Sequence, residues 1–261
     1  RYNVETSNLA SLDSETTTGW GGGLRWTPSP RTDLFLDYDQ RFFGNSHLYG
    51  LNYRTPRTVW SISNRQGLST GQTNFGRGNP GSPFELLFAQ FATVEPDPVA
   101  RAQLVNAFLQ ANGINPNTPL NPSYLPNNVV VERQQNASVA WLGQRSTVVF
   151  TIYQTQSESV LAASINPDDQ FSGGNVIKWR GGSVVWSHRM TPRDTLSISG
   201  SAQRTSQQLS DQETTYWTTM AMWSSQLAQR VTGSLSARYQ NQSGTSSYNE
   251  AALLARLNIT F

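Results

Sequence analysis

A two-residue alternation of apolar and polar side chains constrains the fold most strongly. In the C-terminal segment, apolar residues hold every second position: Ala251, Leu253, Ala255, Leu257, Ile259 and Phe261. The positions between them include Arg256, Asn258 and Thr260. Successive side chains of a strand point to opposite faces of a sheet, so this period predicts a strand with one apolar face.

The same period recurs along the chain, at 34–38, 147–152, 196–203 and 231–240. Short connections rich in Pro, Gly, Gln and Arg separate some of these stretches, at 27–31, 55–57, 142–145, 191–194 and 227–230. Longer polar connections separate the others, at 8–14, 43–46, 67–127, 160–172, 208–212 and 242–247. We therefore expect twelve strands, at 1–7, 15–26, 32–42, 46–54, 57–66, 129–142, 145–159, 173–190, 194–207, 213–226, 230–241 and 248–261.

The mean hydropathy of −0.48 does not decide whether such a chain lies in water or in a membrane. No stretch approaches the roughly 18 apolar residues that a transmembrane helix needs. A transmembrane barrel has a similar average, because every second strand residue faces a polar lumen. The even strand number, with short turns alternating with long loops, predicts an all-β fold. We expect an antiparallel transmembrane β-barrel in a bacterial outer membrane, with both termini and the short turns periplasmic.

The aromatic residues offer a second test of this prediction. The eight Trp residues lie within the expected strands, often near their ends, as in the aromatic girdles at bilayer interfaces. The alternative is the core of a soluble β-sandwich. A sandwich needs apolar inner faces on both sheets, whereas the opposite faces here carry Gln, Ser, Thr and Arg.

The interval 67–127 departs from strand periodicity. Ser82-Pro83-Phe84-Glu85 reads as a helix start, and Asp97-Pro98 starts a second helix that ends at Gly113. We expect helices at 83–92 and 98–112, so residues 1–261 form one barrel with 67–127 as a helical extracellular loop or plug. This loop either enters the lumen or caps the surface. Its candidate gating residues are Phe84, Phe88, Phe91, Arg101 and Phe108.

The charged residues suggest a wet inner wall. Lys178 is the single lysine among 19 basic residues, and the arginines stand alone among Ser, Thr, Gln and Asn rather than in the runs that bind nucleic acid. An excess of guanidinium in the lumen predicts a weak preference for anions; alternatively, these arginines only cross-link the wall. By alternation, the candidate lumen residues are Arg25, Asp37, Asp39, Arg41, Arg65, Glu132, Arg204, Arg238 and Arg256.

Catalytic and metal-binding signals are weak. In Ser46-His47 and Ser187-His188 the neighbouring side chains point to opposite faces of a strand, so neither pair can act as a catalytic dyad. Asp168-Asp169 could contribute oxygen ligands to calcium, but two acids in a loop are a common feature. The glycine-rich run 67–81 lacks the lysine of a phosphate-binding loop. We expect no enzyme activity, no cofactor and no metal.

Several motifs resemble those of a known family. Phe261, after its alternating apolar residues, resembles the C-terminal signal read by the barrel assembly machinery. The stretches 83–91, 96–101 and 112–114 resemble outer-membrane proteins associated with PEP-CTERM and exopolysaccharide loci. Members of that family are longer, so the resemblance implies a short member or the C-terminal portion of a wider barrel. It also implies a role in polysaccharide export with envelope export proteins as partners, in contact with outer-membrane lipid and lipopolysaccharide.

The expected function is therefore an outer-membrane channel or secretion portal, for exopolysaccharide or another polar or anionic polymer. The competing hypothesis is a structural or scaffolding subunit of an envelope complex, with a closed lumen. An outer-membrane enzyme is the third.

Overall fold

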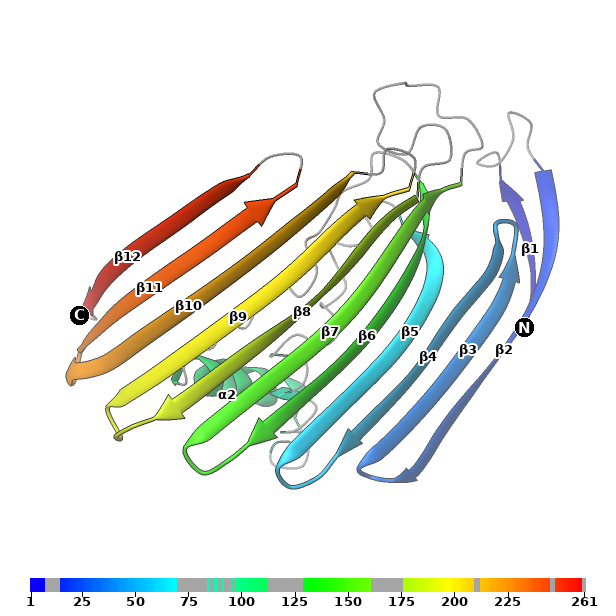
Figure 1. The fold of residues 1–261 in the computed structure, drawn as a ribbon. Helices are drawn as coiled ribbons and strands as arrows, with labels where there is room; N and C mark the ends of the chain where they lie inside the picture. The colour runs from blue at the N-terminus through cyan, green and yellow to red at the C-terminus, as the bar shows by residue number, and fades with distance from the viewer. Residues whose placement is uncertain are drawn as a thin grey trace.

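The computed structural model shows one antiparallel sheet of twelve strands, in which neighbours in sequence are neighbours in space (Figure 1). The structure describes residues 1–7, 15–69, 84, 87–88, 91, 95, 97–111, 129–160, 176–208, 212–244 and 247–259. The strands are β1 (Tyr2–Ser7), β2 (Glu15–Ser29), β3 (Thr32–Arg41), β4 (Gly44–Arg54), β5 (Thr58–Ser69), β6 (Val130–Leu142), β7 (Ser146–Ser159), β8 (Val176–Arg189), β9 (Asp194–Gln207), β10 (Glu213–Ala228), β11 (Val231–Ser243) and β12 (Tyr248–Ile259). The prediction of twelve antiparallel strands is confirmed.

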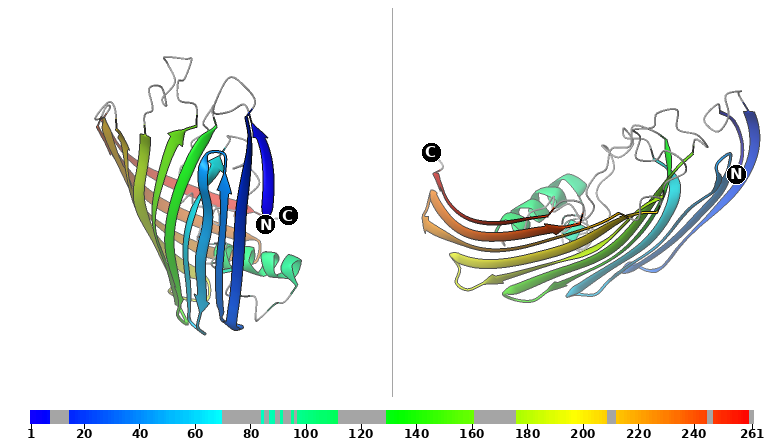
Figure 2. Two further views of the ribbon diagram at one scale, coloured as in Figure 1. Left: turned by 90° about the vertical axis from the view of Figure 1, so that its right-hand side faces the viewer. Right: turned by 45° about the horizontal axis from the view of Figure 1, so that its top comes forward.

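The sheet curls but does not close into a cylinder (Figure 2). β1 and β12 are its two edges, and each has a single neighbouring strand among the described residues. The closed barrel expected from the sequence is therefore not present in this structure. Strand number is a local property of the sequence, whereas closure depends on how the two distant edges meet.

Curling gives the sheet two chemically different faces. One convex row runs through Trp60, Val139, Phe150, Val184 and Gly200, which are paired in register from β5 to β9. The residues next to these in each strand point to the concave face instead. They are mostly polar, as Ser61, Ser138 and Thr151 illustrate. The alternation in the sequence thus separates an apolar convex face from a polar concave face.

Three of the short turns share one local chemistry. In the turn before β5, the Thr55 hydroxyl accepts hydrogen bonds from the backbone N–H groups of Arg57 at 3.3 Å and Thr58 at 2.9 Å. Thr191 repeats both bonds, and Ser29 accepts one from the Arg31 N–H. Proline follows the hydroxyl residue each time and presets φ for the turn. This explains why the chain reverses at these positions.

One helix, α2 (Pro98–Ala111), has described bounds, and it ends one residue before the predicted end. Asp97 caps it, because its carboxylate accepts the N–H of Ala100 at 3.0 Å. The predicted helix 83–92 lies mostly outside the described residues, although Phe84, Leu87 and Phe88 are helical. No helix in the described ranges has the length and apolar character needed to cross a bilayer.

α2 lies on the concave side of the sheet, nearer the short turns than the long loops (Figure 2). Val105 and Leu109 of α2 are fully buried in a cluster with Leu87 and Val185 of β8. Leu142, the last residue of β6, packs against the same cluster. The described helix of the segment between β5 and β6 thus lies in the concavity. The role of residues 67–127 as a plug or as a surface cap stays a prediction, because most of them lie outside the described residues.

Candidate functional site

The concave face brings together most of the residues predicted to line a lumen. Arg25 lies beside Asp33, with 2.8 Å between Nε and a carboxylate oxygen. Arg65 lies 3.4 Å from Glu132, although 67 positions separate them in sequence. The other concave ion pairs are Arg41–Glu5, Arg238–Glu250, Arg1–Asp37 and Arg1–Asp39.

These pairs neutralise the inner wall. Away from the turn ends, the described concave positions carry as many acidic as basic side chains. The basic ones are Arg1, Arg25, Arg41, Arg65, Arg238 and Arg256, and the acidic ones are Glu5, Asp33, Asp37, Asp39, Glu132 and Glu250. The excess of guanidinium expected from the sequence is therefore absent from this part of the wall. The cross-linking alternative describes these arginines better.

Arg204 differs from the prediction. It pairs in register with Arg180 and lies two residues from Ala202 in the convex rows of β9. Arg204 therefore faces outward and not into the lumen. The prediction for Arg204 was wrong because residues an even number of positions apart share a face of the strand. Arg204 therefore shares its face with Leu196 and Ile198, and not with Ser197 and Ser199.

The candidate gating residues meet in one cluster. Phe84, Phe88, Phe91 and Phe108 all pack against the buried core formed by Leu87, Val105, Leu109 and Val185. The ring centroids of Phe91 and Phe108 lie 5.5 Å apart, and the Arg101 guanidinium lies 4.7 Å from the Phe88 centroid. Arg101 also donates to the backbone carbonyl of Glu95 at 2.8 Å. These contacts hold α2 against the concave face of the sheet.

The central strands have polar side chains that are buried on the concave face. They are Gln134, Asn136, Ser138, Thr147, Thr151, Thr155, Ser157, Ser187, Thr195 and Ser197. Beside them, the Tyr153 hydroxyl donates to the Gln203 side chain at 2.9 Å. A Cβ at Gly181 would lie 2.6 Å from that hydroxyl, so only glycine lets the ring cross β8. Hydroxyl and amide groups, rather than charges, thus dominate the middle of the concave face.

A contact between Ser146 and His188 on neighbouring strands was not predicted from the sequence. Ser146 Oγ lies 2.8 Å from His188 Nδ1 at the turn end of β7 and β8, and the Trp186 ring stacks on His188. Only the strand register could have revealed it. No described carboxylate pairs with His188, so the orienting acid of a catalytic triad is not part of this contact.

The other predicted positions that the structure describes make separate local contacts. The His47 ring contacts the Asn64 side chain at 3.1 Å and stacks on Tyr49, while Ser46 donates to the Gln66 carbonyl. In the described ranges, no group of three or more His, Asp and Glu side chains is placed to hold a metal ion. Asp168, Asp169 and Phe261 lie outside the described residues.

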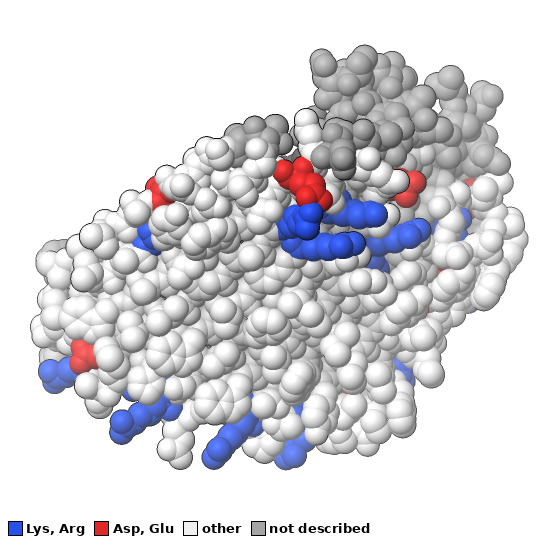
Figure 3. Space-filling model, viewed as in Figure 1, with Lys and Arg blue, Asp and Glu red and all other residues white. Residues whose placement is uncertain are grey.

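The convex face has an uncharged band between two zones that contain basic side chains (Figure 3). At one end, each short turn presents an exposed arginine: Arg31, Arg57, Arg145, Arg193 and Arg230. Toward the loop end, the register places Arg133, Lys178, Arg180 and Arg204 on the convex face of β6, β8 and β9. Between the zones lie exposed Trp60, Trp141, Phe150, Ile152, Val184, Ile198 and Trp223.

No protein-family model matches the sequence, and no curated protein sequence is similar to it. Among solved structures, OmpT, an outer membrane protein of Vibrio cholerae, superimposes with a TM-score of 0.46 at 9% identity, covering 94% of this chain and 64% of that one. The anion-selective porin from Comamonas acidovorans gives 0.43 at 7% identity, covering 91% and 57%. BauA, the ferric preacinetobactin receptor from Acinetobacter baumannii, gives 0.39 at 10% identity, covering 98% and 44%. The chain spans less than two thirds of each of these structures, and its own fold is defined by the strand order and register.

Proposed function

We propose that the chain forms a β-barrel wall in a bacterial outer membrane. The observation that carries the proposal is the convex surface, on which exposed aromatic and aliphatic side chains lie between two basic zones (Figure 3). Lipid tails favour such an apolar band, and basic side chains suit the headgroup regions above and below it. Soluble proteins rarely expose so many Trp, Leu and Ile side chains on one continuous surface.

In a membrane, the backbone N–H and C=O groups at the two sheet edges also need hydrogen-bond partners. An unpaired edge would leave backbone N–H and C=O groups without partners in hydrocarbon. We infer that β1 and β12 are paired in the assembled barrel, either with each other or with further strands. A low-resolution map of the barrel's strand number and circumference separates these two arrangements.

Within this barrel, the concave face supports a channel that α2 narrows. Its wall offers hydroxyl and amide groups, which exchange hydrogen bonds readily with sugar hydroxyls. Its charges are balanced in neighbouring pairs, so we propose a weakly selective lumen rather than an anion-selective one. The family resemblance adds exopolysaccharide as the proposed cargo, and we propose passive transport without an enzymatic step.

Planar-bilayer recording tests the channel. Purified protein should conduct, and dextran fragments added on one side should block the current transiently. Replacing residues 75–125 by a short Gly-Ser linker should raise the conductance, because this removes α2 from the concavity. A protein that inserts but conducts neither before nor after the replacement would contradict the channel.

The second candidate function is a scaffold with a closed lumen, and the packing of α2 favours it. Leu87, Val105 and Leu109 are fully buried between the helical segment and the wall, which is the packing of a permanent core. In that case the wild-type protein stays silent in bilayers while the linker variant conducts. The surface loops would then carry the function by binding envelope proteins.

The orientation of the barrel is a separate prediction. The chain contains no cysteine, so single-cysteine variants report position without background. On intact cells, a membrane-impermeant maleimide should label Asn45→Cys and Gln208→Cys at the loop end. It should spare Arg57→Cys and Arg193→Cys in the short turns until the cells are lysed. The reverse pattern would overturn the topology.

A further inference from the structure

Four basic side chains gather on the convex face, and the proposed channel function does not explain why they lie there. Arg133, Lys178, Arg180 and Arg204 all project from the outer side of the wall near the loop end. Adjacent strands lie about 4.8 Å apart, so these four side chains start within roughly 15 Å of one another. We call them the basic patch. It is visible as the largest group of blue side chains in Figure 3.

The basic patch is electrostatically unfavourable by itself. Arg180 and Arg204 stand directly opposite each other on β8 and β9, and like charges in this position destabilise a strand pair. Two acids adjoin the patch: Glu213 pairs with Arg204, and Glu158 lies at the end of β7. No described carboxylate forms an ion pair with Arg133, Lys178 or Arg180. The patch therefore retains positive charge that an anion from outside the chain can compensate.

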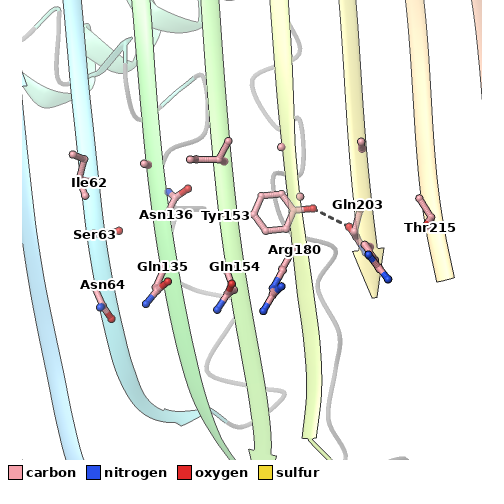
Figure 4. A pocket seen from close by; sticks show the side chains of 16 residues that line it. Ile62, Ser63, Asn64, Gln135, Asn136, Tyr153, Gln154, Arg180, Gln203 and Thr215 are labelled. Atoms are coloured by element: carbon pink, nitrogen blue, oxygen red, sulfur yellow. Dashed lines mark hydrogen bonds between the residues drawn. The ribbon is translucent and has the colours of Figure 1, made fainter. Parts of the chain in front are cut away.

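A groove adjoins the patch on the same face. It has a volume of about 790 Å³. Asn64, Gln135, Gln154, Arg180 and Arg204 form its polar rim, which follows one register row from β5 to β9 (Figure 4). The next row toward the short turns forms its apolar side.

Small residues hollow out this apolar row. Ala137 lies between the larger Ile62 and Ile152, and the small Gly182 and Ala202 follow Ile152 along the row. The rim contributes amide and guanidinium donors, while the row beneath it has only hydrocarbon. The groove thus offers a place for an acyl chain directly below the basic side chains.

We propose that the basic patch and its groove bind a phosphorylated, acylated glucosamine lipid, the lipid A part of lipopolysaccharide. Guanidinium groups suit phosphate because they donate two parallel hydrogen bonds to it. The apolar row beneath the rim receives an acyl chain, and the Gln and Asn side chains contact the sugar. The inference rests on the proposed function, because it requires the convex face to contact lipid and the loop end to face outward.

Lipid retention in detergent tests the site. Purified protein is incubated with diphosphoryl lipid A, passed through gel filtration, and bound lipid is measured by mass spectrometry. The patch variant combines Arg133→Gln, Lys178→Gln, Arg180→Gln and Arg204→Gln. Its affinity for diphosphoryl lipid A should fall by about tenfold or more, because several charge-assisted hydrogen bonds are lost.

A matched control removes the same charge at the other end of the wall, by Arg31→Gln, Arg57→Gln, Arg145→Gln and Arg193→Gln. This control should bind lipid A as the wild type does. Dephosphorylated lipid A should bind the wild type weakly, and inorganic phosphate should not compete, since it lacks the acyl chains. Ala202→Phe, which fills the groove and keeps the charges, should also weaken binding.

The outcomes separate this site from the proposed function. Equal lipid A binding by the patch variant and the wild type overturns the site, as does an equal loss in the turn-end control. Effective competition by inorganic phosphate would indicate a plain anion site, and would also overturn it. Failure of the wild type to insert into phosphatidylcholine vesicles, judged by protease protection, would instead contradict the membrane barrel itself. A patch variant that inserts normally but has lost lipid A supports the site.

Discussion

Substituting aspartate for Val105 should release α2 from the concave wall and raise the conductance of the reconstituted protein several-fold. Val105 is fully buried against Leu87, Leu109 and Val185. A buried carboxylate without a partner costs several kcal/mol, so the helix should leave the wall rather than bury the charge. The milder Leu109→Ala should weaken the same contact by about 2–5 kcal/mol, giving a current that fluctuates between two levels.

The matched control is Val99→Asp on the same helix. The Val99 side chain is 68% exposed, so the same change of chemistry should leave α2 in place and the conductance unchanged. Single-channel recording in planar bilayers provides the measurement for all three variants. If Val105→Asp and Val99→Asp behave alike, α2 does not limit the current. If Val105→Asp conducts while the wild type is silent, the closed-lumen scaffold describes the resting protein.

Placing an arginine on the convex face should destabilise the membrane-inserted protein by about 2–4 kcal/mol, whereas the same change on the concave face should be tolerated. Ile198 lies on the convex face within the apolar band and is 40% exposed. Ile198→Arg would hold a guanidinium among lipid tails. Ser201 on the same strand points to the concave face, so Ser201→Arg keeps its charge among polar groups.

Urea titration of the protein in phosphatidylcholine vesicles, followed by tryptophan fluorescence, measures both variants. Ile198→Arg should lower the free energy of unfolding, while Ser201→Arg should change it by much less. A convex face in contact with water instead of lipid would tolerate Ile198→Arg as well, because an arginine that stays hydrated has no desolvation cost. Equal losses for the two variants would contradict the assignment of faces.

The sequence alone determined the elements that depend on local chemistry. Period-2 alternation predicts all twelve strands, because the side-chain direction of each residue follows from its neighbours. The hydroxyl–proline–arginine turns and the Asp97 cap are equally local, and both appear where the sequence places them. Even the outward direction of Arg204 was within reach, since its parity with Leu196 and Ile198 decides its face.

Only the tertiary structure decided how distant segments meet. The register brings Arg65 to Glu132 and Ser146 to His188, and it sets Arg180 opposite Arg204 beside a groove on the outer wall. It also decides that α2 packs against Val185 inside the concavity, rather than over the outer surface. The physical reason is the range of the interactions. Alternation fixes the face of a side chain within two residues, but its partner depends on how many strands, loops and bulges lie between the two segments.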